Sequence, residues 1–193
     1  MKLNFRKILF KDTKDLAVLH EKNMSGLSTK LGKEYLVKFY QLILSQPEIH
    51  ICLVATLEEK IIGVIILSQD IKKSHQLIKP KLSLNIYLKF IISLIERKIS
   101  LLEIINRLKF EIWVEKKIKT PYLYILALYV DKNYQRQGIG KMLISNIEDY
   151  KSKQDNIKLY VDVRSDNVDA QNFYQEYKFK VKDKLFGAIL MEK

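Results

Sequence analysis

The sequence predicts an α/β fold in one domain. Short runs rich in branched apolar residues alternate with longer segments whose apolar residues recur every three or four positions, which indicates interleaved strands and helices. The chain has 193 residues, of which 48% are apolar and 29% charged, a size and composition typical of one folded globular domain. It contains only three prolines and six glycines, so we expect residues 1–193 to form one unit without long linkers.

The N-terminal part predicts a strand followed by two helices. Apolar and polar residues alternate at the start of Leu3–Leu9, as in a half-buried strand. Asp12 and Thr13 are favourable N-caps for the helical spacing that follows them. The segment Lys33–Leu44 carries its apolar residues on one face of a second helix.

The next segment predicts a hairpin of two core strands. His50–Ala55 and Ile61–Leu67 are short and rich in β-branched residues. The charged residues 58–60 separate them, which favours a turn between paired strands.

The middle segment, Ile71–Thr120, is the least conventional part of the chain. Its Leu and Ile residues form two stripes at helical spacing, over 84–95 and 101–108, which predicts two helices. The longest nearly continuous apolar stretch, Ile86–Ile95, contains Lys89 and is far shorter than the roughly 20 residues that span a bilayer. We therefore expect no transmembrane segment.

The C-terminal part predicts strands and helices in alternation. Tyr122–Val130 is an apolar, aromatic strand, and the glycine pair Gly138 and Gly140 leads from it into a helix. Strict alternation over Ile157–Arg164 predicts the next strand. The last expected elements are a helix capped by one of residues 165–167 and two short strands, Phe179–Val181 and Phe186–Met191.

Composition restricts the partners and the compartment. The net charge of +12 requires that an acidic partner be considered. Lys outnumbers Arg by 29 to 5, whereas proteins that read base sequence depend on Arg, so we expect no specific nucleic-acid partner. The N-terminus lacks the apolar core of a signal peptide, and the single Cys52 cannot form an internal disulfide, which favours a cytoplasmic location. No Cys and His cluster has metal-site spacing, so no metal is predicted.

Gly138 and Gly140 stand between a strand and a helix, where an anion site is expected. Glycine lets a ligand approach the main chain closely, and the first turn of a helix offers free N–H groups and partial positive charge. Arg136 and Lys141 add full charge. The dinucleotide fingerprint requires a third glycine three positions later and the nucleoside-triphosphate loop requires Ser or Thr two positions later, and neither is present.

The segment Gln135–Gly140 instead resembles the pyrophosphate-binding loop of the GNAT superfamily of N-acetyltransferases, whose pattern is Gln or Arg, two residues, Gly, one residue, then Gly or Ala. Val130 and Asp131 precede it at the family's distance. Five later residues resemble the family's next motif: Asn167, Ala170, Phe173, Tyr174 and Phe179.

The resemblance is strongest from Leu126 to Phe179. It departs at Lys132 and Lys178, where the family commonly has Pro and Gly. It implies a GNAT-type twisted mixed β-sheet with helices on both faces and a helical insert at about 71–120.

The resemblance also implies acetyl-CoA as cosubstrate and direct transfer of its acetyl group to a primary amine. Loop N–H groups would hold the pyrophosphate, and the end of the preceding strand would pair with the pantetheine arm. The implied cofactor-binding residues are Leu128, Tyr129, Val130, Gln135, Arg136, Gln137, Gly138, Ile139, Gly140, Lys141, Asn167, Phe173 and Tyr174.

Tyr174 is implied to be the catalytic residue that gives a proton to the leaving thiolate. A thiolate whose acid has a pKa of about 8.5 can accept a proton or hydrogen bond from a phenol of pKa about 10. The alternative is that Tyr174 only packs in the core beside Phe173.

The other catalytic groups stay open at this point. A main-chain N–H near Val130 is the expected oxyanion donor. We expect His20 and His75, which lie in polar surroundings, at the surface. Four residues are candidate general bases and no spacing selects among them: Glu111, Glu115, Tyr124 and His50.

The predicted acceptor is a primary amine of a small molecule, for example an amino sugar or a nucleotide-linked amino sugar. The alternatives are a protein or peptide acceptor, and a CoA-binding adaptor whose insert binds a membrane or a partner helix. The insert either covers the sheet or closes over the acceptor, with Tyr87, Trp113 and Tyr122 available as contacts. A homodimer is a further open partner prediction.

Overall fold

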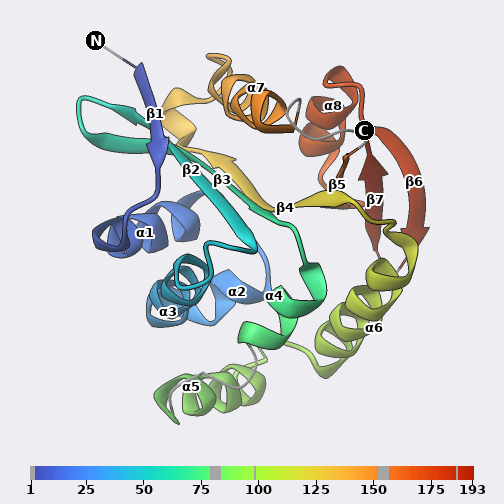
Figure 1. Ribbon diagram of the computed structural model, residues 1–193. Helices are drawn as coiled ribbons and strands as arrows, with labels where there is room; N and C mark the ends of the chain where they lie inside the picture. The colour runs from blue at the N-terminus through green and yellow to red at the C-terminus, as the bar shows by residue number, and fades with distance from the viewer. Residues whose placement is uncertain (1–2, 79–83, 98, 152–156, 186) are drawn as a thin grey trace.

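A seven-stranded mixed sheet runs through the protein (Figure 1). The computed structural model describes residues 3–78, 84–97, 99–151, 157–185 and 187–193. The strand order is β1-β2-β3-β4-β5-β7-β6, and neighbouring strands are antiparallel except for the parallel pair β4 and β5. The strands are β1 Leu3–Lys7, β2 His50–Leu57, β3 Lys60–Ser68, β4 Tyr122–Val130, β5 Lys158–Arg164, β6 Lys180–Leu185 and β7 Ala188–Glu192.

The helices follow the predicted order, with two differences. A short helix, α2, precedes α3, and the middle segment forms three helices where we expected two, because residues 71–78 make a separate helix. Phe186, at the start of the last expected strand, lies outside the described residues. The α-helices are α1 Thr13–Asn23, α2 Leu27–Lys30, α3 Gly32–Leu44, α4 Ile71–Ile78, α5 Leu84–Ile95, α6 Leu101–Lys117, α7 Ile139–Lys151 and α8 Val168–Glu176; the 3-10 turns are η1 Phe10–Asp12 and η3 Lys132–Tyr134.

Helices cover both faces of the sheet, as predicted (Figure 1). On one face, α7 and α8 pack on the strands through residues that include Leu143, Ile144, Ile147 and Tyr174. On the other face, α1 and α3 cover β2, β3 and β4 through Leu16, Leu19, Tyr40 and Ile43. Farther along that face, α4 and α6 cover β4, β5 and β7 through Ile71, Phe110 and Val114. Two clusters thus share one face and meet near β4, where Leu126 contacts both.

The parallel pairing of β4 and β5 stops in the middle of the sheet. The last paired residues are Ile125 and Val161, although β4 continues to Val130 and β5 to Arg164. At the same place the pairing of β3 with β4 shifts, so that Leu126 has no partner across the ladder. A bulge bends the strand that contains it, so β4 turns away from β5. We call the place where pairing ends, between residues 126–130 and 162–164, the β4–β5 opening.

Our expectation that His20 and His75 lie at the surface is wrong. Their side chains are buried, at 5% and 9% exposure, because each histidine lies on the inner side of its helix while the charged neighbours in sequence face solvent. His20 Nδ1 is 2.8 Å from the Tyr40 hydroxyl, which is 2.6 Å from the Tyr129 hydroxyl. This hydrogen-bonded chain ties α1 and α3 to β4.

The burial of His20 predicts how stability depends on pH. Burial lowers the pKa of His20 from 6.5 to about 4, so the unfolded chain takes up a proton at mildly acidic pH while the folded chain does not. The free energy of unfolding is therefore lost as the pH falls below about 6.5, by about 2 kcal/mol between pH 7 and pH 5 from this group.

Urea unfolding of the wild type and of His20→Gln at both pH values measures this contribution. The variant should lose about 2 kcal/mol less than the wild type over the same interval. Equal losses in the two proteins would contradict the assignment.

Candidate active site

The loop between β4 and α7 presents unpaired main-chain N–H groups. Gly138 has φ +79° and Arg136 φ +62°, and these left-handed residues let the chain turn sharply into the helix. Among the described residues, the N–H groups of residues 136–141 make no hydrogen bond; the first one in the helix that does is that of Met142, which donates to the Gly138 carbonyl. Free donors at a helix N-terminus fit a phosphate or diphosphate.

Gly140 has a different role from Gly138, because its environment is crowded. A Cβ atom at Gly140 would lie 3.2 Å from the ring of Phe173 and 3.9 Å from a methyl group of Val130. The absence of a side chain therefore lets α7 approach α8 closely. Phe173, which we predicted as a cofactor contact, forms this packing contact, and its ring also lies 5.2 Å from that of Tyr174.

Two predicted cofactor-binding side chains, those of Gln135 and Asn167, form hydrogen bonds within the protein. Gln135 Nε2 donates to the Val130 carbonyl at 2.9 Å and so fixes the start of the loop to the end of β4. Asn167 Oδ1 accepts from the Ala170 N–H at 3.1 Å and caps α8, which is the capping that the sequence predicted. Both contacts position the site, and direct contact of these two residues with the cofactor stays a prediction.

The positive side chains of the loop face solvent. Arg136 is highly exposed and lies 3.7 Å from Asp169, so this ion pair is a weak one. Lys141 is exposed beside the ring of Tyr177. Gln137 is also exposed, whereas Ile139 is buried in the core below the loop.

The end of β4 offers main-chain groups to the opening. The Asp131 N–H donates to the Ile62 carbonyl of β3, and successive residues of an antiparallel strand point to opposite sides. The N–H groups of Leu128 and Val130 therefore point away from β3, into the β4–β5 opening. Tyr129 points its main-chain groups at β3 and buries its side chain, so the structure does not bring this predicted cofactor contact to the opening.

Tyr174 lies in the core on the α7–α8 side of the sheet. It is 6% exposed, and its ring packs against Phe173 and Phe179, each with centroids 5.2 Å away. Burial raises the pKa of Tyr174, and the negative charge of Asp162 raises it further. The phenol is therefore protonated at neutral pH. Asp162 follows Val161, the last residue of β5 that pairs with β4, so its charge lies at the β4–β5 opening.

A polar cluster occupies the opposite face of the sheet at the same place. The Tyr124 hydroxyl donates to Asp162 Oδ1 at 2.6 Å. Arg107 of α6 donates to Asp162 Oδ2 at 3.4 Å and to Glu111 Oε1 at 3.2 Å. We call these four residues, Tyr124, Asp162, Arg107 and Glu111, the acceptor-side cluster.

Burial and neighbouring charges shift the pKa values of Tyr124 and Arg107 in this cluster. Burial raises the pKa of Tyr124 well above its ordinary value, and the charge and hydrogen bond of Asp162 add to the effect. Burial opposes the charge on Arg107, but the carboxylates of Asp162 and Glu111 outweigh it and raise the pKa of Arg107. Burial and the Glu111 charge also raise the pKa of Tyr35 to about 12, which places α3 at the border of the cluster.

The structure separates the four candidate bases. Tyr124 and Glu111 belong to the cluster, whereas Glu115 lies beside it and pairs with His75 at 3.2 Å. His50 Nε2 is 2.9 Å from the Ser74 hydroxyl, so this histidine fastens α4 to the sheet. Sequence reasoning missed Asp162 and Arg107.

The remaining predicted features of the site have structural contacts. Trp113 packs on Phe110 with centroids 5.4 Å apart, and the Tyr122 hydroxyl accepts from the Ile71 N–H at 3.0 Å. The Tyr87 side chain lies outside the described residues.

Burial raises the pKa of Cys52 to about 12, which leaves the thiol unreactive. In the described part of the chain no group of metal ligands gathers, and no helix is long and apolar enough to cross a membrane.

Comparison with known proteins identifies the family. The model of the acetyltransferase (GNAT) family matches residues 16–179, which is most of the chain. The protein therefore belongs to this family and is an acyl-CoA-dependent N-acetyltransferase with acetyl-CoA as its cosubstrate. The resemblance drawn from Gln135–Gly140 and from the motif around Tyr174 is confirmed.

Solved structures with the same fold include several N-acetyltransferases. The PaiA N-acetyltransferase from Thermoplasma acidophilum, in complex with coenzyme A, has 18% identity and a TM-score of 0.64, covering 100% of this chain and 99% of that chain. The ribosomal-protein-S18-alanine N-acetyltransferase from Escherichia coli has 14% identity and a TM-score of 0.59, with 99% and 92% coverage. Naa50 from Arabidopsis thaliana, in complex with the bisubstrate analogue CoA-Ac-MVNAL, has 16% identity and a TM-score of 0.61, with 100% and 99% coverage. At these identities the similarity establishes the fold, as predicted, and leaves the acceptor open.

Crowding at Gly140 gives a testable prediction. Gly140→Val should push Phe173 away from the loop, lower the free energy of unfolding by about 1–3 kcal/mol and raise the KM for acetyl-CoA. Phe173→Leu in the same chain should recover part of both losses, because the two side chains are in contact. Thermal unfolding and initial rates measure the cycle.

The matched control is Gly187→Val, where nothing lies within 4 Å of an added Cβ and φ is +75°. It should cost stability through backbone strain without changing the KM. An unchanged KM in Gly140→Val would contradict the role of this contact in shaping the loop.

Proposed function

We propose that the protein transfers the acetyl group of acetyl-CoA directly to a primary amine of a small, positively charged molecule. The observation that carries this proposal is the β4–β5 opening. The diphosphate-fitting loop and Tyr174 lie toward one face of the sheet, and the acceptor-side cluster lies on the other. An amine that enters from the cluster side would therefore meet a thioester laid along the end of β4.

The donor side follows from the free main-chain groups. The N–H groups of residues 136–141 would hold the pyrophosphate, and the edge of β4 at Leu128 and Val130 would pair with the pantetheine arm as a strand would. One of these two N–H groups would also stabilise the oxyanion of the reacting carbonyl. Tyr174 would donate its proton to the thiolate as the C–S bond breaks.

The acceptor side is supported by an excess of negative charge. Asp162 and Glu111 both contact the Arg107 guanidinium, Glu111 also lies 3.9 Å from His75 Nδ1, and Glu115 lies nearby on the same helix. An ammonium group would be attracted to these carboxylates. The amine must lose a proton before it attacks, and the Tyr124 hydroxyl bonded to Asp162 offers a route by which that proton reaches the carboxylate.

The negative charge of the acceptor-side cluster favours an amino sugar as the acceptor. An amino sugar carries one ammonium group and neutral hydroxyls, which suits carboxylates beside a single Arg. A nucleotide-linked amino sugar would need Arg107 to meet its phosphates. A peptide acceptor is the rival, since two structures of the same fold are a ribosomal-protein N-acetyltransferase and an enzyme bound to a peptide-based bisubstrate analogue.

An acceptor screen tests the proposal. We expect small cationic amines, with amino sugars and polyamines among them, to release free thiol from acetyl-CoA with a kcat/KM at least about tenfold above that of peptides with a free N-terminus. Nucleotide-linked amino sugars form a separate arm that tests Arg107. A preference for peptides, or thiol release that no amine accelerates, would overturn the small-molecule proposal.

Two conservative variants on opposite faces test the proton steps. Tyr174→Phe and Asp162→Asn should each lower kcat by about 10²–10⁴-fold, while calorimetry finds the affinity for coenzyme A within twofold of wild type, since neither side chain belongs to the loop. The matched control is Asp166→Asn, an exposed carboxylate in the segment after β5 that pairs with Arg164, which should keep normal turnover.

Unchanged turnover in Tyr174→Phe would refute the acid role and leave Tyr174 as a packing residue. Unchanged turnover in Asp162→Asn would refute the base assignment. Because the Asp162 charge raises the pKa of Tyr174, the double variant Tyr174→Phe with Asp162→Asn measures how far the two effects are coupled.

A further inference from the structure

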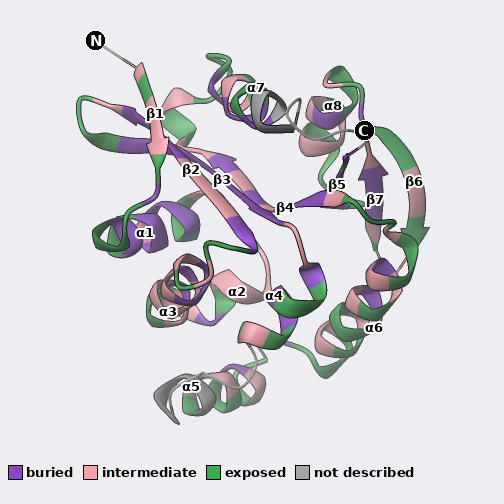
Figure 2. Cartoon of the chain, in the orientation of Figure 1, coloured by how far each residue is buried: buried purple, intermediate pink, exposed green. Residues whose placement is uncertain are grey.

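The helices α5 and α6 each present an apolar stripe to solvent. On α5 the stripe is Leu88, Ile91, Ile92 and Ile95, at 50–76% exposure, with spacing i, i+3, i+4, i+7. On α6 it is Leu101, Leu102, Ile105, Leu108 and Ile112, at 41–67% exposure. Figure 2 shows exposed residues along both helices. We call these nine residues the α5–α6 apolar surface.

The α5–α6 apolar surface exposes more apolar area than scattered surface Leu and Ile residues would. The nine residues expose on the order of 900 Å² summed over the two helices, and the five on α6 account for about 500 Å² of it, which is comparable with the largest apolar patch of a typical monomer, about 300–600 Å². The opposite side of α6 is already buried, through Phe110 and Val114. The outward stripe therefore has no packing function within the described residues.

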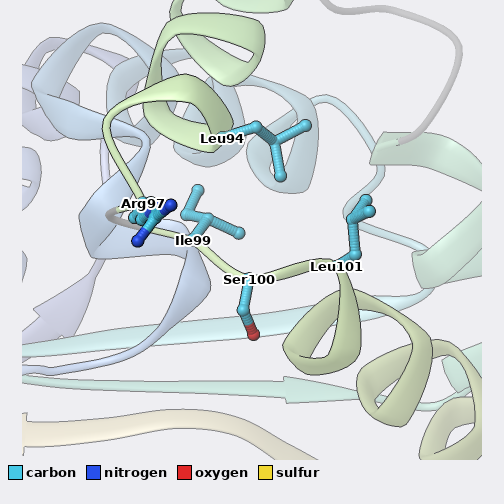
Figure 3. A pocket seen from close by; sticks show the side chains of 5 residues that line it. All are labelled: Leu94, Arg97, Ile99, Ser100 and Leu101. Atoms are coloured by element: carbon cyan, nitrogen blue, oxygen red, sulfur yellow. The ribbon is translucent and has the colours of Figure 1, made fainter.

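A hollow lies in the turn between the two helices, next to Leu101 of the α6 stripe. Leu94, Ile99 and Leu101 line a cavity of about 370 Å³ together with Arg97 and Ser100 (Figure 3). Arg97 is exposed there and has φ +56°. The Ser100 hydroxyl accepts from the Glu103 N–H and caps α6. The hollow thus combines apolar walls with one guanidinium.

The segment that carries this surface holds most of the protein's net charge. Residues 71–120 contain 12 Lys and Arg against 4 Asp and Glu, a net charge of +8 of the total +12. Within it, Glu103 pairs with Lys30 at 2.7 Å and Glu115 with His75, and three of the basic residues pair with carboxylates outside the segment: Lys73 with Asp70, Arg107 with Asp162 and Lys117 with Asp183. A partner for this surface must therefore accept both exposed Leu and Ile side chains and a strong positive charge.

A second copy of the chain does not meet that requirement. A symmetric dimer would place two such segments, each with a net charge of +8, against each other, and like charges brought together oppose association. An anionic lipid surface meets it, because Leu and Ile enter the acyl boundary while Lys and Arg reach the head groups.

We propose that the α5–α6 apolar surface docks on an anionic phospholipid bilayer, with Arg97 at a lipid phosphate. Each basic residue near such a surface adds about 1 kcal/mol of attraction. The inner face of α6 carries Arg107 and Glu111, so docking would hold the acceptor-side cluster close to the bilayer. The proposal does not depend on the acceptor class proposed above.

Sedimentation with vesicles tests the proposal on the full chain. We expect the protein to partition at least tenfold more strongly into phosphatidylcholine vesicles with about 30% phosphatidylglycerol than into pure phosphatidylcholine. Raising the salt concentration from about 0.1 M to about 0.5 M should weaken the binding, since salt screens the charge. Equal binding to the two vesicle types, or no binding to either, overturns the proposal.

Variants assign the binding to this surface. Ile92→Gln, Ile95→Gln and Leu102→Gln combined should reduce partitioning at least tenfold, and Arg97→Gln should reduce it severalfold. The control is Phe10→Gln combined with Val181→Gln, which removes exposed apolar side chains on other parts of the protein, at 59% and 44% exposure, and should bind as the wild type does.

Retained binding in the triple variant would place the lipid contact elsewhere and overturn the assignment. Thermal unfolding within a few degrees of wild type checks that the variants fold. Light scattering without lipid measures the oligomeric state of the wild type and of the triple variant. A dimeric wild type and a monomeric variant would identify a second copy as the occupant of this surface and would also overturn the proposal.

Discussion

The end of pairing between β4 and β5 is the constraint on which the rest of the site depends. Two parallel strands that stayed paired would close the sheet, and nothing on one face could act on anything on the other. The unpartnered residue at Leu126 bends β4 just after Ile125, the last residue paired with Val161. The N–H groups of Leu128 and Val130 then have no strand to pair with, and buried main-chain groups need a partner. In the proposed function, the extended pantetheine arm would supply one.

The two faces of the sheet contribute different chemistry to this opening because different helices cover them. On one face Gly140 lets Phe173 of α8 pack closely against α7, and burial keeps the Tyr174 phenol protonated. On the other face Arg107 of α6 reaches Asp162 between the two apolar clusters. In the proposed function, the proton donor and the carboxylates would therefore approach the reaction centre from opposite faces.

The sequence was sufficient for features that depend on local pattern. Tyr122–Val130 was predicted with its observed bounds because the run is apolar and bounded by Pro121 and Asp131. A cap among residues 165–167 followed from side-chain chemistry, and the structure selects Asn167. Asp162 could not be found in this way. Alternation correctly placed it with Lys158 and Tyr160 on one side of the strand, but that side reads as solvent-facing until α6 is known to cover it. The same reason explains the error at His20, whose burial depends on the packing of α3 and not on its neighbours in the chain.

Helix α6 combines several of the functions that were predicted as alternatives for the middle segment. A cover for the sheet, an acceptor-site element and a membrane-binding surface do not exclude one another, because different faces of one helix can serve them. Phe110 and Val114 face the sheet, and Arg107 and Glu111 reach the acceptor-side cluster from adjacent positions. Ile105, Leu108 and Ile112 occupy the remaining side. Residues three or four positions apart are neighbours on a helix, and Leu102 and Ile105 stand at neither spacing from Arg107 or Glu111. Substitutions at these two outer positions would therefore alter the proposed docking without moving the proposed acceptor contacts.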